Sequence, residues 1–129
     1  MSTIKAEVIA IEDVRSHPNA DALELATLNG WQVCVRKGAY KNGDAVVYFE
    51  QGTQLPLATA EAIDVTKYMS QKTNIDGERV LVVHRVKLRG EPSFGLVVTP
   101  EPGMEIGQDV AAHYGATKFD PPLKFSAGD

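Results

Sequence analysis

The sequence predicts an all-β domain. Glycine and proline recur at short intervals, and the runs between them are rich in valine, leucine, isoleucine, threonine and aromatic residues, which is typical of β-sandwiches and β-barrels. A length of 129 residues suits one domain. The longest apolar run, residues 45–49, has the length of a strand and falls far short of a membrane-spanning helix, so we expect no membrane association.

The strand-like runs follow one another in a simple order. The first is residues 4–11, whose end is apolar on both faces. Residues 22–28 and 31–35 are separated by Asn29-Gly30, a strong signal for a two-residue hairpin. A turn at 41–44 precedes the next run. The remaining strand-like runs are residues 45–50, 79–88 and 92–99.

Two connectors have helical character. Residues 51–77 form a long connector that needs structure of its own, and a short helix is expected at 58–62. A second short helix is expected at 107–114, because Gly115 is a suitable C-terminal stop. We interpret the whole as a five-stranded oligonucleotide/oligosaccharide-binding (OB) barrel, closed or partly open. The predicted domain is 1–115, followed by an extended tail over 116–129 that Pro121-Pro122 keeps from being helical.

Charge is distributed unevenly. Thirteen basic and seventeen acidic residues give a net charge of −4, which argues against strong sequence-independent binding to nucleic acid. Residues 79–90, however, contain four basic residues and no acid. If this run is one strand, alternate residues face the core and Arg85, Lys87 and Arg89 form an exposed row spaced about 6.5–7 Å apart, comparable to phosphates along a strand. A merely solvated strand face is the alternative.

A second basic window lies between residues 31 and 42, which contain no acid. Its cations are Arg36, Lys37 and Lys41, and they could bind phosphates while a base stacks on a neighbouring ring. We expect Tyr40, in a turn, to be that ring. Trp31 alternates with apolar residues on its strand, so we expect it to fill the core.

Catalytic and metal-binding patterns are weak. His17, His84 and His113 have no ligand spacing, and the lone Cys34 excludes an internal disulfide and suits a reducing cytoplasm. The segment 72–77 resembles a nucleotidyl-transfer motif, but its lysine stands two residues too early before the Asp-Gly pair. We therefore predict no metal, no cofactor and no catalytic residue. The turn His17-Pro-Asn-Ala-Asp21 is interpreted as structural.

Several motifs together resemble the N-terminal OB domain of nick-sealing RNA ligases, over nearly the whole chain. These motifs are Asn19-Ala-Asp21, Gly30-Trp-Gln-Val-Cys-Val-Arg-Lys-Gly38, Gly43-Asp44, Val47-Tyr-Phe-Glu50, Leu55-Pro56, Val86-Lys-Leu-Arg-Gly90, Ser93-Phe-Gly-Leu96 and Gly115-Ala-Thr-Lys-Phe-Asp-Pro-Pro122. A looser resemblance, to tRNA-binding OB domains, is carried by residues 17–21 and 88–95. One departure is Phe94, which replaces a polar residue usual in the ligases. The adenylyltransferase domain that follows in that family is absent from this sequence.

These observations predict a module that grips the phosphate backbone of RNA, or of an RNA-containing duplex, near a nick. The predicted contacts are Arg85, Lys87, Arg89, Arg36, Lys37 and Lys41, with Tyr40 for stacking. On its own the chain is expected to catalyse nothing, although a ligase adenylyltransferase domain is a possible partner. The alternatives are a protein-interaction adaptor or inhibitor, supported by the acidic net charge, a tRNA-binding auxiliary domain, and, with little support, an oligosaccharide binder.

Overall fold

The computed structural model describes residues 6–63, 65–66 and 69–120. Within these ranges the chain forms twelve strands and two helices. The first six strands are β1 (Ala6–Ala10), β2 (Asp13–Ser16), β3 (Leu23–Leu28), β4 (Trp31–Arg36), β5 (Ala45–Phe49) and β6 (Thr53–Leu55). Helix α1 (Leu57–Ala62) precedes β7 (Met69–Thr73), β8 (Arg79–Val83), β9 (Val86–Leu88), β10 (Glu91–Ser93) and β11 (Leu96–Val98). Helix α2 (Ala111–Tyr114) and β12 (Thr117–Lys118) complete the described chain.

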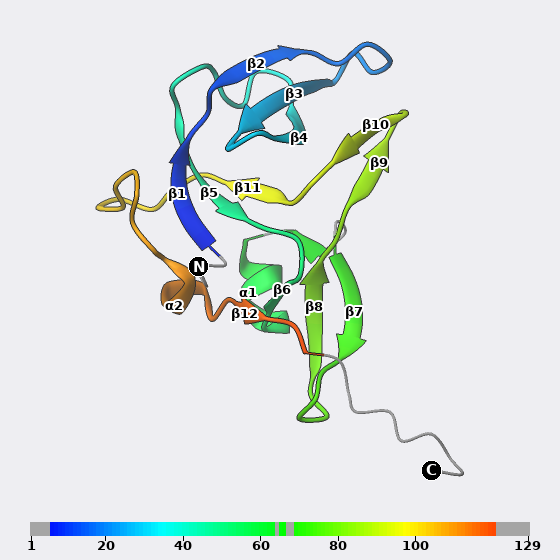
Figure 1. Ribbon diagram of the computed structural model, residues 1–129, viewed down its shortest axis with the longest axis vertical. Coiled ribbons are helices and arrows are strands. Elements are labelled where there is room, and N and C mark those ends of the chain that lie inside the picture. Colours follow the sequence, from blue (N-terminus) through cyan, green and yellow to red (C-terminus); the bar gives the residue numbers. More distant parts are fainter. Residues whose placement is uncertain (1–5, 64, 67–68, 121–129) are drawn as a thin grey trace.

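The strands are arranged in layers (Figure 1). The sheet β2-β3-β4 lies on one side, the sheet β1-β5-β11 in the middle, and the sheet β12-β6-β8-β7 on the other side. The β9–β10 hairpin extends from the end of β8 towards β4. Neither helix has the length and apolar character needed to cross a membrane, as far as the described residues go.

The middle sheet is buried on both faces. In β5, Val47 and Phe49 belong to one apolar cluster, whereas Val46 and Tyr48 belong to a second. The same split holds in β1, where Val8 faces the first cluster and Ile9 the second. Consecutive strand residues point to opposite faces, so a strand between two cores is apolar over most of its length. This arrangement explains why the first predicted strand is apolar on both faces at its end.

The predicted number of five strands is wrong, and so is the closed form of the barrel, one of the two forms expected. Long predicted runs are divided by bends, such as the one at 84–85 between β8 and β9. The sheets of the described residues do not close into a barrel, because β4 and β10 meet without a backbone ladder. Pro92 has no N–H to donate, and Cys34 N donates to the side chain of Ser93 at 2.9 Å rather than to a backbone carbonyl.

Smaller elements also differ from the sequence reading. Helix α1 agrees with the expected connector helix, but α2 is shorter than predicted and starts at Ala111, where the backbone N–H is held by Asp109 Oδ1 at 2.9 Å. Gly115 ends α2 in the left-handed conformation, with φ of 67°. All of Val80–Val83 are buried, so β8 has no solvent-facing side over these residues. The predicted tail is described only to Asp120, where β12 pairs with β6, and Pro121-Pro122 and the start of the first strand lie outside the described residues.

Candidate nucleic-acid interface

The β9–β10 hairpin displays three cations. Arg85 lies at the bend after β8, Lys87 lies in β9 and Arg89 lies in the turn, and all three are exposed. Val86 and Leu88, which alternate with them, are half-buried. This short strand therefore separates a cationic side from an apolar side, which the longer β8, buried over Val80–Val83, does not do.

These cations have no acidic partner in the described part of the chain. Its only two ion pairs join Arg15 to Asp13 at 3.7 Å and His113 to Glu101 at 2.7 Å. The three hairpin cations therefore remain available to an external anion, and the same holds for Arg36, Lys37 and Lys41 within these residues.

The turn of this hairpin is unusual and is held from outside. Arg89 and Gly90 have φ of 52° and 90°, as in the two-residue turns that usually take asparagine or glycine. A non-glycine residue there costs about 1–2 kcal/mol. Asn19 Nδ2 donates to Arg89 O at 2.9 Å and thus fixes the turn.

A buried histidine supports the same hairpin. His17 is 6% exposed, and its Nδ1 accepts a hydrogen bond from Asn19 N at 2.9 Å. Its Nε2 lies 2.9 Å from Leu88 O and must donate, so the ring is the neutral Nε2–H tautomer. The turn at 17–21 therefore has the structural role that the sequence suggested, and what it positions is the cationic hairpin.

The second basic window is only partly brought to this site. Arg36 and Tyr40 line a cavity of about 370 Å³ together with Val86 and Leu88 of the hairpin. Lys37 and Lys41 are exposed on the loop between β4 and β5, away from this lining. Tyr40 itself is half-buried: its ring packs against the core cluster beneath β3 and β4, and its hydroxyl lies 3.2 Å from Thr99 Oγ1.

The cavity lies at the seam where the barrel is not closed. Its remaining walls come mainly from β4 and β11 and are largely apolar. Cys34, on β4, is half-buried there, and burial raises the pKa of its thiol, with the charge of Glu91 adding to the rise and the Ser93 hydrogen bond opposing it. A protonated, half-buried thiol is a poor nucleophile. Across the described residues no group of three or more side chains suited to a metal ion is present.

Trp31 is not in the core, contrary to the sequence prediction. It is 44% exposed, although Leu28, its partner across the hairpin, is fully buried. Val33 and Val35, which alternate with it on β4, belong to the buried cluster, whereas Trp31, the first residue of the strand, does not. Its ring packs against Phe94, with centroids 5.5 Å apart and planes tilted by 47°. The guanidinium of Arg85 lies 6.0 Å from the Phe94 centroid. Phe94 therefore lies next to both the Trp31 ring and the Arg85 cation.

The sequence analysis missed Phe94 as a member of the site. The one signal was its departure from the polar residue usual at that position. Its backbone is fixed from two sides, because Phe94 N donates to Gln32 O at 2.8 Å and the Tyr48 hydroxyl donates to Phe94 O. Gly95 follows with φ of 115°, and a Cβ there would lie 2.6 Å from Phe49 O.

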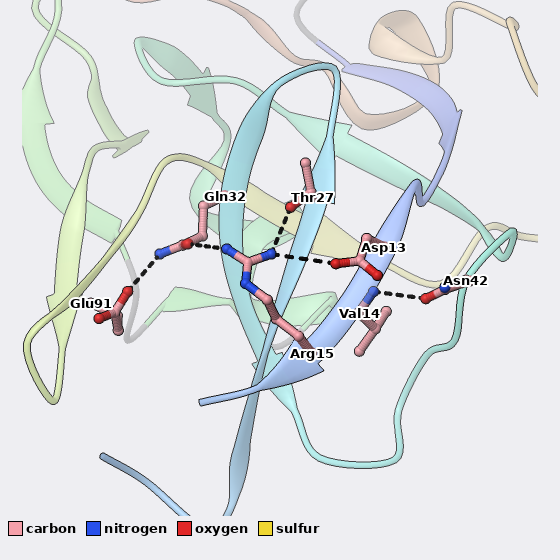
Figure 2. A network of polar contacts seen from close by, with 7 residues as sticks. All are labelled: Asp13, Val14, Arg15, Thr27, Gln32, Asn42 and Glu91. Carbon is pink, nitrogen blue, oxygen red and sulfur yellow. Dashed lines mark hydrogen bonds and ion pairs between the residues drawn. The ribbon is translucent and has the colours of Figure 1, made fainter. Parts of the chain in front are cut away.

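The opposite face of the β2-β3-β4 sheet is polar and carries acids. Figure 2 shows Arg15 donating to Thr27 Oγ1 at 3.0 Å and to Gln32 Oε1 at 2.7 Å, beside Asp13. Gln32 Nε2 lies 3.3 Å from Glu91 Oε1. Arg15 is thus already engaged by protein groups. Because adjacent strand residues face opposite ways, this network and the ring of Trp31 lie on different faces.

Comparisons with known proteins agree with this fold. The profile of the PHA02142 OB-fold domain family matches residues 5–100. No curated protein sequence matches the chain.

Similar solved structures include those of Naegleria gruberi RNA ligase. An apo variant of that ligase is 25% identical with a TM-score of 0.80, and the match covers 99% of this chain and 38% of the ligase. A variant with ATP and Mn is 27% identical with a TM-score of 0.78, covering 92% and 36% of the two chains. This chain therefore spans little more than a third of the length of the ligase.

Proposed function

Because the chain belongs to the PHA02142 OB-fold domain family, we propose that it is an RNA-binding module that grips the phosphate backbone of a nicked, RNA-containing duplex. The observation that carries this proposal is the exposed row Arg85, Lys87 and Arg89, which has no carboxylate partner among the described residues. Arg36 extends the row through the shared cavity, while Lys37 and Lys41 act as outer contacts and Tyr40 offers a ring edge.

The binding energy comes from displaced counterions. Each phosphate that a lysine or arginine neutralises releases a condensed cation, so affinity falls steeply with salt. Backbone contacts of this kind position the protein without reading sequence. The acidic net charge of −4 keeps non-specific binding weak, and therefore the local row, rather than the whole surface, decides where RNA lies.

The decisive experiment measures affinity for a nicked RNA duplex against salt, by fluorescence anisotropy. One variant carries Arg85→Gln, Lys87→Gln and Arg89→Gln. The matched control carries Lys72→Gln, Arg79→Gln and Lys118→Gln, three exposed cations on the β7-β8-β6-β12 sheet. We expect the first variant to lower the salt slope by about 2–3 and to weaken binding roughly 100-fold at 0.1 M salt, and the control to bind as wild type.

Equal losses in both variants would refute the row as the binding site. If the wild type fails to bind nicked duplex and structured RNA at low salt, the chain is better explained as a protein-interaction adaptor. A clear preference for tRNA over nicked duplex would favour a tRNA-binding auxiliary role.

We further propose that this module acts beside an adenylyltransferase domain, with residues 116–129 as the connecting tail, in the cytoplasm. Support comes from the similarity to part of an RNA ligase. The chain contains no lysine two residues before an Asp-Gly pair, so on its own it should form no covalent adenylate. Incubation with labelled ATP tests this, and label retained on any lysine would contradict it.

A further inference from the structure

We propose that Trp31 and Phe94 form a stacking platform for an unpaired nucleobase, with Arg85 binding a phosphate beside it. This inference rests on the proposed function and goes beyond it, because the cationic row alone would bind any polyanion. The platform adds a preference for nucleic acid with a free base face, such as a single strand or a strand end, since the bases inside an intact duplex are already stacked on one another.

The exposed ring is positioned by the local backbone. Asn29 and Gly30 have φ of 49° and 79°, which makes the tight turn that starts β4 at Trp31. Leu28 and Val33 belong to the buried cluster, whereas Trp31 does not and remains 44% exposed. Burying a tryptophan is strongly favourable, and an exposed one beside cations indicates a binding surface more than a packing residue.

The second ring holds the first in place. Phe94 is anchored through Gln32 O and through the Tyr48 hydroxyl, and Gly95 allows no side chain beside it. The tilted contact with Trp31 at 5.5 Å limits the motion of the indole. A platform that is fixed before binding loses little conformational entropy when a base stacks on it.

Charge indicates a nucleotide rather than a protein partner. Arg85 lies 6.0 Å from the Phe94 ring and continues directly into the row formed by Lys87 and Arg89. An aromatic face next to unpaired cations is the arrangement that single-stranded nucleic acid requires, since the rings take bases and the cations take phosphates. Asp13 is paired with Arg15 at 3.7 Å, and the side chain of Glu91, although it lies on β10, is engaged by Gln32 Nε2 at 3.3 Å.

Intrinsic fluorescence gives a direct readout, because Trp31 is the only tryptophan in the chain. Titration with single-stranded RNA at low salt should quench its emission with the same dissociation constant that anisotropy reports. Inorganic polyphosphate, which has charge but no bases, should bind the cations without this quenching. Equal quenching by polyphosphate would contradict stacking.

Substitution separates the platform from the cationic row. Trp31→Leu should weaken binding to single-stranded RNA roughly 5- to 100-fold with an unchanged salt slope, and Trp31→Phe should retain most of the affinity. Ile106→Ala, at another exposed apolar residue that is 60% exposed, is the matched control and should bind as wild type. Circular dichroism checks that each variant is folded, and Phe94→Leu offers a second route to the same loss.

The outcomes also distinguish this inference from the proposed function. If Trp31→Leu binds RNA as wild type and the wild type shows no quenching, the platform is wrong, although a steep salt slope that depends on the cationic row would keep the proposed function. If the wild type binds no RNA at all, both are wrong, and the exposed rings are then better explained by a protein partner.

Discussion

The β7–β8 and β9–β10 hairpins share the run Arg79–Leu88. They differ in how their tips are held and in the charges that surround them. The β7–β8 hairpin closes its tip mainly through its own Asn74, which is 3% exposed and whose Oδ1 accepts hydrogen bonds from Asp76 N and Glu78 N, both at 3.0 Å. One bond comes from outside the hairpin, from Ile75 N to Asp120 O at 2.9 Å. The β9–β10 hairpin is held by residues far away in sequence, namely His17 and Asn19.

Their surroundings differ as well. Asp76 and Glu78 lie three residues and one residue before Arg79, whereas residues 79–90 contain no acid. The acid that follows them, Glu91, has its side chain 3.3 Å from Gln32 Nε2. A basic strand therefore does not make a binding site by itself. What distinguishes the β9–β10 hairpin is a support from distant residues, three cations that form no ion pair with a carboxylate of the described residues, and a neighbouring pair of rings.

The largest expected effect concerns the root of the β9–β10 hairpin. Gly95→Ala would place a Cβ 2.6 Å from Phe49 O and 2.7 Å from Tyr48 Cε1, in backbone with φ of 115°. We expect a loss of more than about 3 kcal/mol in the free energy of unfolding. Gly77→Ala, in the β7–β8 tip with φ of 81° and nothing within 4 Å, should lose only about 1 kcal/mol. Urea unfolding measures both, and similar losses would contradict the described packing.

The next largest effect on stability is expected at His17 and Asn74, the residues that hold the tips of the β9–β10 and β7–β8 hairpins. His17→Ala and Asn74→Ala each remove buried hydrogen bonds, so each should cost about 1–3 kcal/mol of stability. Only His17→Ala should also weaken RNA binding, by roughly 2- to 10-fold, because the cationic turn becomes less ordered. Equal RNA affinity in the two variants, measured by anisotropy on the folded proteins, would show that the support is irrelevant to binding.

Alkaline pH should loosen the root of β10. Burial raises the pKa of Tyr48 above its ordinary value, and the charge of Glu50 adds to this. The unfolded tyrosine ionises above about pH 10, whereas the folded one stays neutral. Its stabilisation is therefore complete below pH 10 and should fall by about 1.4 kcal/mol per pH unit above it. Unfolding at several pH values should show this fall in the wild type to be steeper than in Tyr48→Phe, and parallel curves would be inconsistent with it.

The smallest expected effect is at the strained turn. Arg89→Gly removes the cost of φ at 52°, so stability should stay level or rise by up to about 1 kcal/mol. The salt slope of RNA binding should nevertheless fall by about 0.7–0.9. Arg79→Gln, in β8, should leave the slope unchanged. A loss of stability in Arg89→Gly would mean that the arginine side chain, and not only its backbone, holds the turn.

Local patterns in the sequence predicted much of this fold. The Asn29-Gly30 hairpin, the turn at 41–44 and the connector helix are set by neighbouring residues. The division of the strands and the open seam were not predictable in the same way, because they depend on Pro92 and Ser93 meeting β4 from far away in the chain.

The candidate site likewise has one part that local sequence patterns indicate and another that depends on residues far apart in the chain. Alternation along one predicted strand, residues 79–88, was the basis for expecting Arg85, Lys87 and Arg89 on one side. In the structure only Lys87 lies in a strand, and Arg85 and Arg89 flank it. The exposed position of Trp31 was not predictable in this way. Its ring packs against Phe94, which is 63 positions away in sequence. Alternation on β4 alone assigned Trp31 to the core, since it carries no information about the length of that core.

The most direct test of the RNA-binding surface compares how three arginine side chains respond to RNA in one experiment. In the ¹H–¹⁵N spectrum of the wild type, the side-chain Nε–H resonances of Arg79, Arg85 and Arg89 can be followed while nicked RNA duplex is added at low salt. The account predicts that Arg85 and Arg89 shift and saturate together while Arg79 stays in place. Shifts at Arg79 alone, or equal shifts at all three, would contradict the claim that the β9–β10 hairpin is the surface that grips RNA.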